Sequence, residues 1–394
     1  MSLAEEKNDS ALHNDESPPP DFSFLLRPEI YHPLTALNVP TSFRDSPKQP
    51  DDPDTKVSQL LQRGHFRAAA IAAVQELTGS RAGEEKEREK EKGRGVDPRD
   101  GRRILDLFYT RLACLTLIDA TPIAAQEAKA LEDLNSVRVY VDDKTGQHLA
   151  PWPLRLLNVR LQSLGFGDPR RAVMSYYDLA REARLQICKS RKVQDGEDAK
   201  LWTERLHDLA MLVAGALVDM DDLAGAAHLL ESLPEATTTM TTTGSRSSRL
   251  SLCRALLALQ IGDVDRARKW AGSKDDADKV MQALCDVADA DYEAALAKWQ
   301  AIEEEGEEDE AVAVNKAVCL LYLGRMDEGR AVLERRLAMK GASSPSHSLL
   351  FNLSTMYELC TDNHRRLKMG LAERVASMEE SAAGWERNNA DFKL

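Results

Sequence analysis

Aromatic residues are scarce in this chain of 394 residues, where they make up only 5% of the sequence. Strands are enriched in aromatic and β-branched residues, whereas Leu and Ala, which abound here, favour helices, so the composition predicts a helical protein. No apolar run approaches the roughly 18 residues that a membrane-spanning helix needs, and the first residues are acidic and polar. We therefore expect neither a transmembrane segment nor a signal peptide, and any contact with a membrane only through partner proteins.

Paired cysteines are also lacking. The six cysteines stand alone, without a C-x-x-C pair, at positions 114, 188, 253, 285, 319 and 360. Most fall on apolar helical faces, where a free cysteine acts as a small hydrophobic residue. This distribution predicts a protein of the reducing cytoplasm rather than a disulfide-bonded or zinc-binding one.

Positive charge is in deficit, because the net charge is −13. Proteins that bind nucleic acid or anionic membranes by charge need clustered Lys and Arg to contact phosphate groups. We therefore expect no nucleic-acid partner.

The motifs of the common enzyme classes are missing as well: H-E-x-x-H, G-x-x-x-x-G-K-[ST] and G-x-S-x-G do not occur. Gly165 and Gly167 form a lone G-x-G that follows no strand, and Asp168-Pro169 comes directly after it. The eight histidines lie far apart, and the acidic run at residues 303–310 is typical of a solvated linker rather than of a calcium loop. The sequence predicts no enzyme, no cofactor and no metal site.

The C-terminal third carries a repeating pattern. Residues 315–324 read as a helix that stops at Gly324, and a second helical period begins at Met326. Residues 351–357 then repeat the Asn-x-small opening of the first helix. A two-helix unit of about 34 residues is typical of tetratricopeptide repeats.

The same turn signal recurs from residue 121 onward: a turn residue, an apolar or Pro residue, and a small residue three places later. The small residue lets two helices approach closely. The spacing varies, from 34 residues between Tyr292 and Met326 to 28 between Val264 and Tyr292. We predict an all-α, right-handed tetratricopeptide-like solenoid of about seven degenerate helix pairs. The small residues expected at helix crossings are Ala172, Ala226, Ala267, Ala295 and Gly329.

Residues 1–55 hold nine of the sixteen prolines and many Asp and Ser residues, a composition typical of a disordered tail. Apolar residues between positions 22 and 43 leave two interpretations open: incidental hydrophobic residues, or an extended segment that docks on the solenoid or on a neighbouring subunit. Residues 56–394 are predicted to form the solenoid. We expect charged insertions near residues 81–100 and 189–200, a Thr/Ser-rich one near 237–248, and a capping helix at about 365–385.

Candidate interaction residues cluster near the Gly324 turn. Tyr322, Arg325, Met326 and Tyr357 are side chains of the kind that anchor protein interfaces. For the two tyrosines, packing between neighbouring repeats is the competing interpretation.

Several segments carry a closer resemblance. They are AVCLLYLG (317–324), LLFNLSTMYEL (349–359), LFYTRLACL (107–115), PWPLRLLNVRLQSLGFGDPRRAV (151–173) and LWTERLHDLAMLV (201–213). In this order they resemble the subunit 12 family of the transport (trafficking) protein particle (TRAPP) complex, over roughly residues 100–394.

The resemblance implies a non-catalytic scaffold or adaptor subunit of a TRAPP III-type vesicle-tethering complex in ER-to-Golgi transport and autophagy. It implies contacts with the large subunits 8 and 11, and a link to a Rab GTPase through the core of the complex. It also implies a cytoplasmic protein peripheral to Golgi and ER–Golgi intermediate membranes. The alternative is a tetratricopeptide co-chaperone that binds acidic chaperone C-terminal peptides, with Asn315 and Asn352 in the clamp positions and Lys316 beside the first.

Overall fold

The computed structural model describes residues 20–50, 55–79, 96–142, 146–234, 244–272, 276–306, 309–339 and 344–394. In these ranges all regular elements are helices, and the only β-type pairing is an isolated bridge between Val141 and His148. None of the helices in these ranges is long and apolar enough to cross a membrane. The predicted all-α fold class is confirmed.

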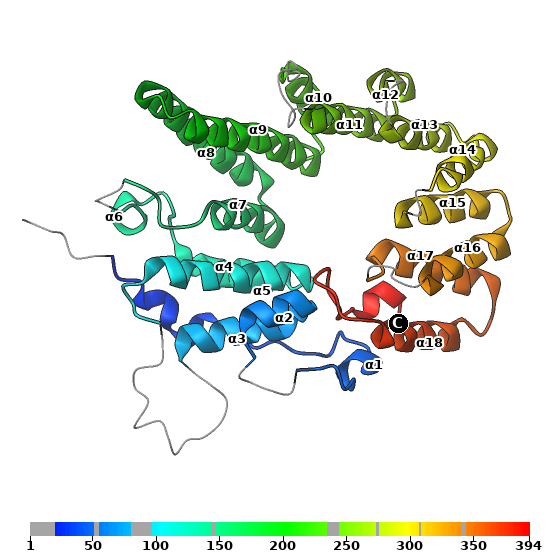
Figure 1. Cartoon of the computed structure of the whole chain (residues 1–394), viewed down its shortest axis with the longest axis horizontal. Helices are drawn as coiled ribbons and strands as arrows, with labels where there is room; N and C mark the ends of the chain where they lie inside the picture. Colours follow the sequence, from blue (N-terminus) through cyan, green and yellow to red (C-terminus); the bar gives the residue numbers. More distant parts are fainter. Residues whose placement is uncertain are drawn as a thin grey trace, which may run out of the picture.

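The helices follow one another as antiparallel pairs, each packed against its neighbours in sequence (Figure 1). Eight pairs lie in the described ranges, where about seven were predicted. They are α2 (Val57–Arg63) with α3 (Phe66–Thr78), α4 (Gly101–Leu117) with α5 (Thr121–Ala128), α7 (Trp152–Phe166) with α8 (Pro169–Val193), α9 (Gly196–Asp219) with α10 (Leu223–Ser232), α11 (Gly244–Ile261) with α12 (Val264–Ala271), α13 (Asp276–Ala288) with α14 (Tyr292–Glu304), α15 (Glu310–Tyr322) with α16 (Met326–Ala338), and α17 (His347–Cys360) with α18 (His364–Ser377). Short helices complete the chain: η1 (Ser23–Leu26), η2 (Pro28–Ile30), α1 (Thr41–Arg44), η3 (Lys129–Leu131), α6 (Val137–Tyr140) and η4 (Asn389–Phe392).

The turns within the pairs share one local structure. In seven of the eight, a residue with positive φ ends the first helix: Gly64, Asp119, Gly167, Asp221, Gly262, Ala290 and Gly324. In four of them the next residue is an aspartate that caps the second helix, because its carboxylate accepts a hydrogen bond from a backbone amide of the first turn. These pairs are Asp168 with Arg171, Asp222 with Gly225, Asp263 with Arg266 and Asp291 with Ala294, at 2.9–3.1 Å.

The small residues expected at helix crossings lie inside. Ala172, Ala226, Ala267 and Ala295 are at most 1% exposed, and Gly329 is buried as well. At Gly329 the crossing is close, since a Cβ atom there would lie 3.1 Å from the carbonyl oxygen of Ala317 and 3.3 Å from Met356 Cε. A side chain at this position would therefore press on the backbone of α15, and glycine lets α16 pack closely against it.

The charged stretch 189–200 differs from the predicted insertion. It forms the end of α8 and the start of α9, two helices of 25 and 24 residues, joined at Gln194. Asp195 caps α9 through the amide of Asp198 at 3.1 Å. Charges spaced three or four residues apart suit the exposed face of a helix as well as they suit a loop, so charge composition does not distinguish the two here.

The other predicted insertions fall largely outside the described ranges, which omit residues 80–95 and 235–243. The capping helix near 365–385 corresponds to α18, but α18 ends at Ser377. Residues 378–394 continue without regular structure up to η4 and pack back on the molecule.

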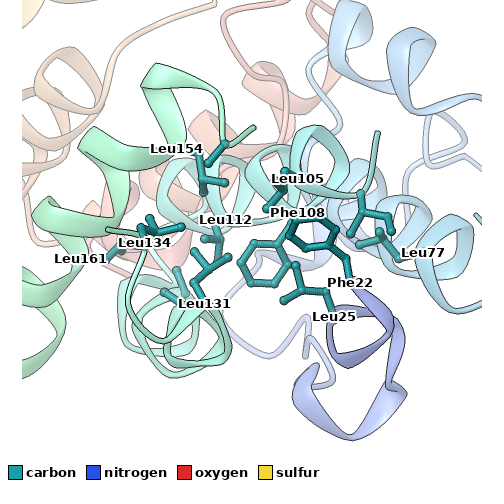
Figure 2. Close-up of a cluster of buried hydrophobic side chains, with 14 of the residues drawn as sticks. Phe22, Leu25, Leu77, Leu105, Phe108, Leu112, Leu131, Leu134, Leu154 and Leu161 are labelled. Atoms are coloured by element: carbon teal, nitrogen blue, oxygen red, sulfur yellow. The ribbon is translucent and has the colours of Figure 1, made fainter. Parts of the chain in front are cut away.

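The apolar residues of the N-terminal segment are buried rather than free. Phe22 and Leu25 are fully buried in a cluster with Leu77 of α3 and Phe108 of α4, which Figure 2 shows. The segment is anchored because large apolar side chains leave water there, which offsets the cost of ordering a proline-rich chain. The prediction of disorder up to residue 55 therefore differs from the structure over residues 20–50. The division into a tail and a solenoid stays a prediction.

The two ends of the solenoid meet, so the helix pairs form a closed ring (Figure 1). We call the contact of residues 38–50 and 55–67 with residues 376–394 the clasp. The backbone amide of Asn389 donates to the carbonyl oxygen of Asn38 at 2.7 Å, and that of Trp385 donates to Gly64 at 3.1 Å. Terminal repeats of an open solenoid need a cap for their outer faces, and in this ring each end covers the other.

Candidate interaction surfaces

The four predicted interaction residues separate into exposed and buried ones. Tyr322 is 64% exposed and stacks on Tyr292 of the preceding pair, with ring centroids 4.6 Å apart and planes 4° from parallel. Tyr357 is only 3% exposed and belongs to the core around α17. Met326 is half-buried at the start of α16. Tyr322 therefore remains at the surface, whereas Tyr357 fits the packing interpretation.

Arg325 occupies the position that aspartate takes in four other pairs, the N-cap of the second helix. Its side chain makes no cap hydrogen bond. It instead donates two hydrogen bonds to the carboxylate of Glu328, at 2.8 and 2.6 Å, and stays 48% exposed. This pairing lowers the pKa of Glu328 and raises that of Arg325. A cation at a helix N-terminus faces the positive end of the helix dipole. Arg325 therefore stabilises α16 less than an aspartate at the same N-cap position would.

The residues of the suggested peptide clamp, Asn315 and Asn352, form hydrogen bonds within their own helices. The side-chain amide of Asn315 donates to the carbonyl oxygen of Ala311 at 2.9 Å, and that of Asn352 to Ser348 at 2.8 Å. Lys316 is 12% exposed and paired with Glu303. One N–H of each amide and the ammonium group of Lys316 are thus engaged within the solenoid.

A polar groove lies over α7, with α5 and α8 as its walls, and its volume is about 640 Å³. We call it the α7 groove. The floor of the groove is formed by Arg155, Asn158 and Gln162 of α7. These polar residues are three and four positions apart, so they lie on the same face of the helix. Arg155 and Asn158 are only 4% and 7% exposed.

Arg155 is fixed in the floor by its neighbours. It forms a two-point ion pair with Glu182 of α8, with one nitrogen–oxygen distance of 2.9 Å, and its guanidinium lies 5.4 Å from the ring centre of Trp152. Burial alone would raise the pKa of Glu182, but the hydrogen bonds and charge of Arg155 hold that pKa below its ordinary value. The carboxylate thus stays ionised and the floor keeps one geometry.

The clasp combines an aromatic centre with charged flanks. Trp385, 2% exposed, lies against Phe43 and His65, with ring centroids 5.3 and 5.0 Å away. Glu380 receives hydrogen bonds from Arg63 at 2.5 and 2.9 Å and lies 3.1 Å from His65 Nε2. These contacts, led by the Arg63 hydrogen bonds, lower the pKa of Glu380.

Lys48 adds a further link in the clasp. Its ammonium group donates to the carbonyl oxygens of Ser377 and Met378 at 2.9 and 2.5 Å, at the C-terminal end of α18. A cation is favoured there because the helix dipole is negative at that end.

Metal-binding clusters and buried cysteine thiols were the remaining candidate groups for chemistry in the part of the chain that the structure describes. Within it, no group of three or more His, Cys, Asp or Glu residues could hold a metal ion. Burial raises the pKa of Cys114 to about 12, and it also raises the pKa of Cys285 and Cys319, so these thiols are not activated nucleophiles.

Sequence reasoning missed both the α7 groove and the clasp. The groove lies in the family-like stretch 151–173, where Asn158 and Gln162 interrupt an apolar helix at helical spacing. That interruption is a signal that could have been used. The clasp left a weaker trace: Trp385 and Phe392 stand in an otherwise polar C-terminal stretch.

Comparison with known proteins gives two curated relatives. The chain is 24% identical over 314 residues to the human trafficking protein particle complex subunit 12, covering 70% of this chain and 41% of the relative. It is 25% identical over 316 residues to the mouse protein of the same name, covering 70% and 38%. The chain thus spans about two-fifths of the length of the curated relatives it matches.

No family model matches the chain. Two solved helical-repeat structures are distant neighbours. A tetratricopeptide repeat protein from Parabacteroides merdae gives a TM-score of 0.38 at 13% identity, over 73% of this chain and 96% of its own. The tetratricopeptide domain of P58(IPK) gives 0.21 at 12%, over 83% and 93%. By its helix pairs the chain is an all-α solenoid, and by its curated relatives it is similar to subunit 12 of the trafficking protein particle complex.

Proposed function

We propose that the chain is a non-catalytic scaffold or adaptor subunit of a TRAPP III-type vesicle-tethering complex. The observation that carries the proposal is the similarity to subunit 12 over 70% of the chain. A solenoid of helix pairs supports a binding role, because stacked repeats form extended surfaces for partner proteins.

In this proposal the protein works in ER-to-Golgi transport and autophagy. It contacts the large subunits 8 and 11, and the core of the complex activates a Rab GTPase. The chain itself is cytoplasmic and reaches Golgi and ER–Golgi intermediate membranes through its partners. Its net charge of −13 supports this indirect attachment, since anionic lipid headgroups repel an acidic surface.

The surface around the Gly324 turn, between α15 and α16, is the proposed docking surface. Exposed Tyr322 and Arg325 lie there with half-buried Met326, next to one another on consecutive helices. Arginine and tyrosine are the residue types that most often dominate binding energy in interfaces. The N-cap position of Arg325, which costs stability, is explained if the guanidinium serves a partner instead.

Affinity purification of the tagged chain from cell extract tests the proposal. Tethering subunits in the eluate support it, whereas chaperones in their place support the co-chaperone alternative. The variant Arg325→Glu is expected to lose the large subunits, while Arg335→Glu, an exposed arginine on the same helix, retains them. Unchanged recovery with Arg325→Glu would remove Arg325 from the docking surface.

A nucleotide-exchange assay tests the non-catalytic role. The purified chain, mixed with a Rab GTPase loaded with fluorescent nucleotide, is expected to leave release at its intrinsic rate. A dose-dependent acceleration would contradict a pure scaffold.

A further inference from the structure

One side of α8 carries the opposite charge to the chain as a whole. Of the 25 residues of α8, seven are Arg or Lys and two are Asp or Glu, in a chain whose net charge is −13. All seven cations are exposed, from Arg170 to Lys192. We call this exposed side of α8, between these two residues, the α8 face. It lies on the hairpin of α8 and α9, the two longest helices that the structure describes (Figure 1).

We propose that the α8 face lies on an anionic lipid bilayer once partner proteins have brought the chain to a membrane. This direct contact goes beyond the proposed function, in which the chain reaches membranes through its partners. Which membrane the face meets rests on the proposed function, whereas the chemistry of the face does not.

The cations of the α8 face are available to lipid headgroups. Arg181 pairs with Asp178 at 2.6 Å. Glu182, the other carboxylate of α8, pairs with Arg155. Both carboxylates of α8 are thus neutralised, and a cluster of unpaired Lys and Arg is what phosphate groups attract. Six cations form no ion pair with any residue that the structure describes: Arg170, Arg171, Arg184, Lys189, Arg191 and Lys192.

Large apolar side chains lie between these cations. Met174, Tyr177 and Leu185 are 70%, 44% and 63% exposed. With Arg181 they follow at intervals of three and four residues, so they form one line along the helix. The α8 face is about 33 Å long, and the opposite side of α8 is buried in a core shared with α7 and α9. Cations mixed with exposed apolar residues along one helix are typical of a helix that lies on a membrane surface.

A bilayer fits this face better than a protein partner does. Protein interfaces have well-packed cores in which side chains enter matching pockets. Side chains as exposed as Met174 and Leu185 stand on the ridge of a helix, so a protein would need a groove shaped to that ridge. A bilayer needs no matching shape, because its headgroups surround the cations and its acyl boundary takes up the apolar side chains.

The negative charge of the whole chain does not prevent this contact at close range. The Debye length is about 8 Å at physiological salt, so carboxylates elsewhere on the ring are screened from a membrane that touches α8. Asp195 and Glu197 follow the face at the turn into α9, where Asp195 is engaged as the N-cap. The net charge of −13 still opposes the first approach, so the contact follows recruitment by partners rather than replacing it.

The test holds the full chain on lipid vesicles through a histidine tag and a nickel-chelating lipid, which stand in for the partners. Vesicles that contain phosphatidylserine are compared with vesicles of phosphatidylcholine alone. Acetylation by an amine reagent, read by mass spectrometry, should be at least about fivefold slower at Lys189 and Lys192 on the phosphatidylserine vesicles. Lys269, exposed on α12, should react at the same rate on both.

Charge reversal identifies the surface that makes the contact. The variant Arg170→Glu, Arg184→Glu, Arg191→Glu keeps both reporter lysines and should lose the difference between the two kinds of vesicle. It should fold like the native chain, because these arginines have no ion-pair partner among the described residues. If circular dichroism shows lost helix, Arg184→Gln with Arg191→Gln replaces it and should reduce the difference at least about twofold.

The matched control changes the net charge by the same amount on other helices. It reverses three exposed arginines of α16 and α18 and should keep the slower acetylation of Lys189 and Lys192 on phosphatidylserine vesicles: Arg335→Glu, Arg365→Glu and Arg366→Glu.

Three results would overturn the proposal. Equal acetylation of Lys189 and Lys192 on the two kinds of vesicle would show that the α8 face does not lie on the anionic surface. Equal slowing in the native chain and the α8 variant would place the membrane contact elsewhere. Loss of a tethering subunit from the α8 variant in affinity purification would assign the face to a protein partner.

The α8 face and the proposed function can fail separately. If tethering subunits co-purify with the native chain but the two lysines react equally on both kinds of vesicle, the membrane contact fails and the proposed function stands. If the lysines are protected but no tethering subunit co-purifies, the proposed function fails alone.

Discussion

Replacing Trp385 with alanine should open the ring without unfolding the helices. The indole is 2% exposed and lies nearly edge-on to Phe43, at an interplanar angle of 64°. Its Nε1 donates to the carbonyl oxygen of Ala376 at 3.3 Å. Because Trp385 contacts both ends of the chain, its removal weakens the clasp more than any helix pair.

The size of the effect follows from the burial. Truncation of a fully buried Trp to Ala costs about 3–5 kcal/mol, a figure that includes the cavity and the lost aromatic contact. At about 1.4 kcal/mol per tenfold change, the ratio of closed to open rings should fall by a factor between about 100 and several thousand. Small-angle X-ray scattering measures this as a larger radius of gyration, and far-UV circular dichroism should show unchanged helix content.

Trp299→Ala provides the matched control. Trp299 is fully buried in α14, in the core that α14 shares with α13 and α15, and makes no clasp contact. Its loss should lower the free energy of unfolding by a similar amount but leave the radius of gyration near the native value. An unexpanded ring in Trp385→Ala, or an equal expansion in Trp299→Ala, would refute the assignment of the clasp as the closing contact.

Three further changes have defined outcomes. Ala295→Leu should overpack the crossing of α13 and α14 and lower the free energy of unfolding by about 1–3 kcal/mol in urea titrations. Arg325→Asp should raise it by about 0.5–1 kcal/mol, because aspartate caps α16 as it caps other helices of this chain. Lowering the pH should open the clasp. The Arg63 hydrogen bonds hold the pKa of Glu380 below its ordinary value of 4.5. The ionised carboxylate therefore stabilises the clasp fully above pH 4.5, and this stabilisation is lost as the pH falls through the lowered pKa. X-ray scattering across this acid range reports the opening.

Each of these outcomes has a control. Glu293→Leu, on the exposed side of α14, should change the free energy of unfolding by no more than about 0.5 kcal/mol. Arg325→Ala separates the removal of the cation from the gain of a cap, and equal stability of the Ala and Asp variants would contradict the capping argument. Glu380→Gln should make ring closure insensitive to acid, and an unchanged acid transition in that variant would assign the effect to other carboxylates.

The helix pairs could be predicted because the residues that determine each turn are adjacent in the sequence. A turn such as Gly262-Asp263-Val264 holds its positive φ, its cap and its first apolar residue within three positions. Contacts between sequence neighbours then place each pair on the next. The same reasoning failed at residues 189–200, where charge composition alone could not separate an exposed helix from a loop.

The clasp and the α7 groove could not be predicted from local sequence patterns, because both depend on contacts between distant parts of the chain. Trp385 pairs with Gly64 across more than 300 residues, and no repeat pattern specifies a contact between the first and last units. The floor of the groove depends on how far α5 and α8 stand apart over Asn158, which is a property of packing rather than of spacing. For the candidate interaction residues, the sequence named Tyr322 and Tyr357 alike, and burial separates them.

A linear stack of repeats frays from its ends, because a terminal unit has one neighbour and an internal unit has two. In a ring every unit has two neighbours, so opening begins either at the clasp or by breaking two interfaces at once. Hydrogen exchange should therefore be nearly uniform around the native ring and graded toward the ends once Trp385 is removed. Closure also fixes the curvature, which holds distant faces such as the Gly324 turn and the α7 groove at a constant separation for any partner that spans both.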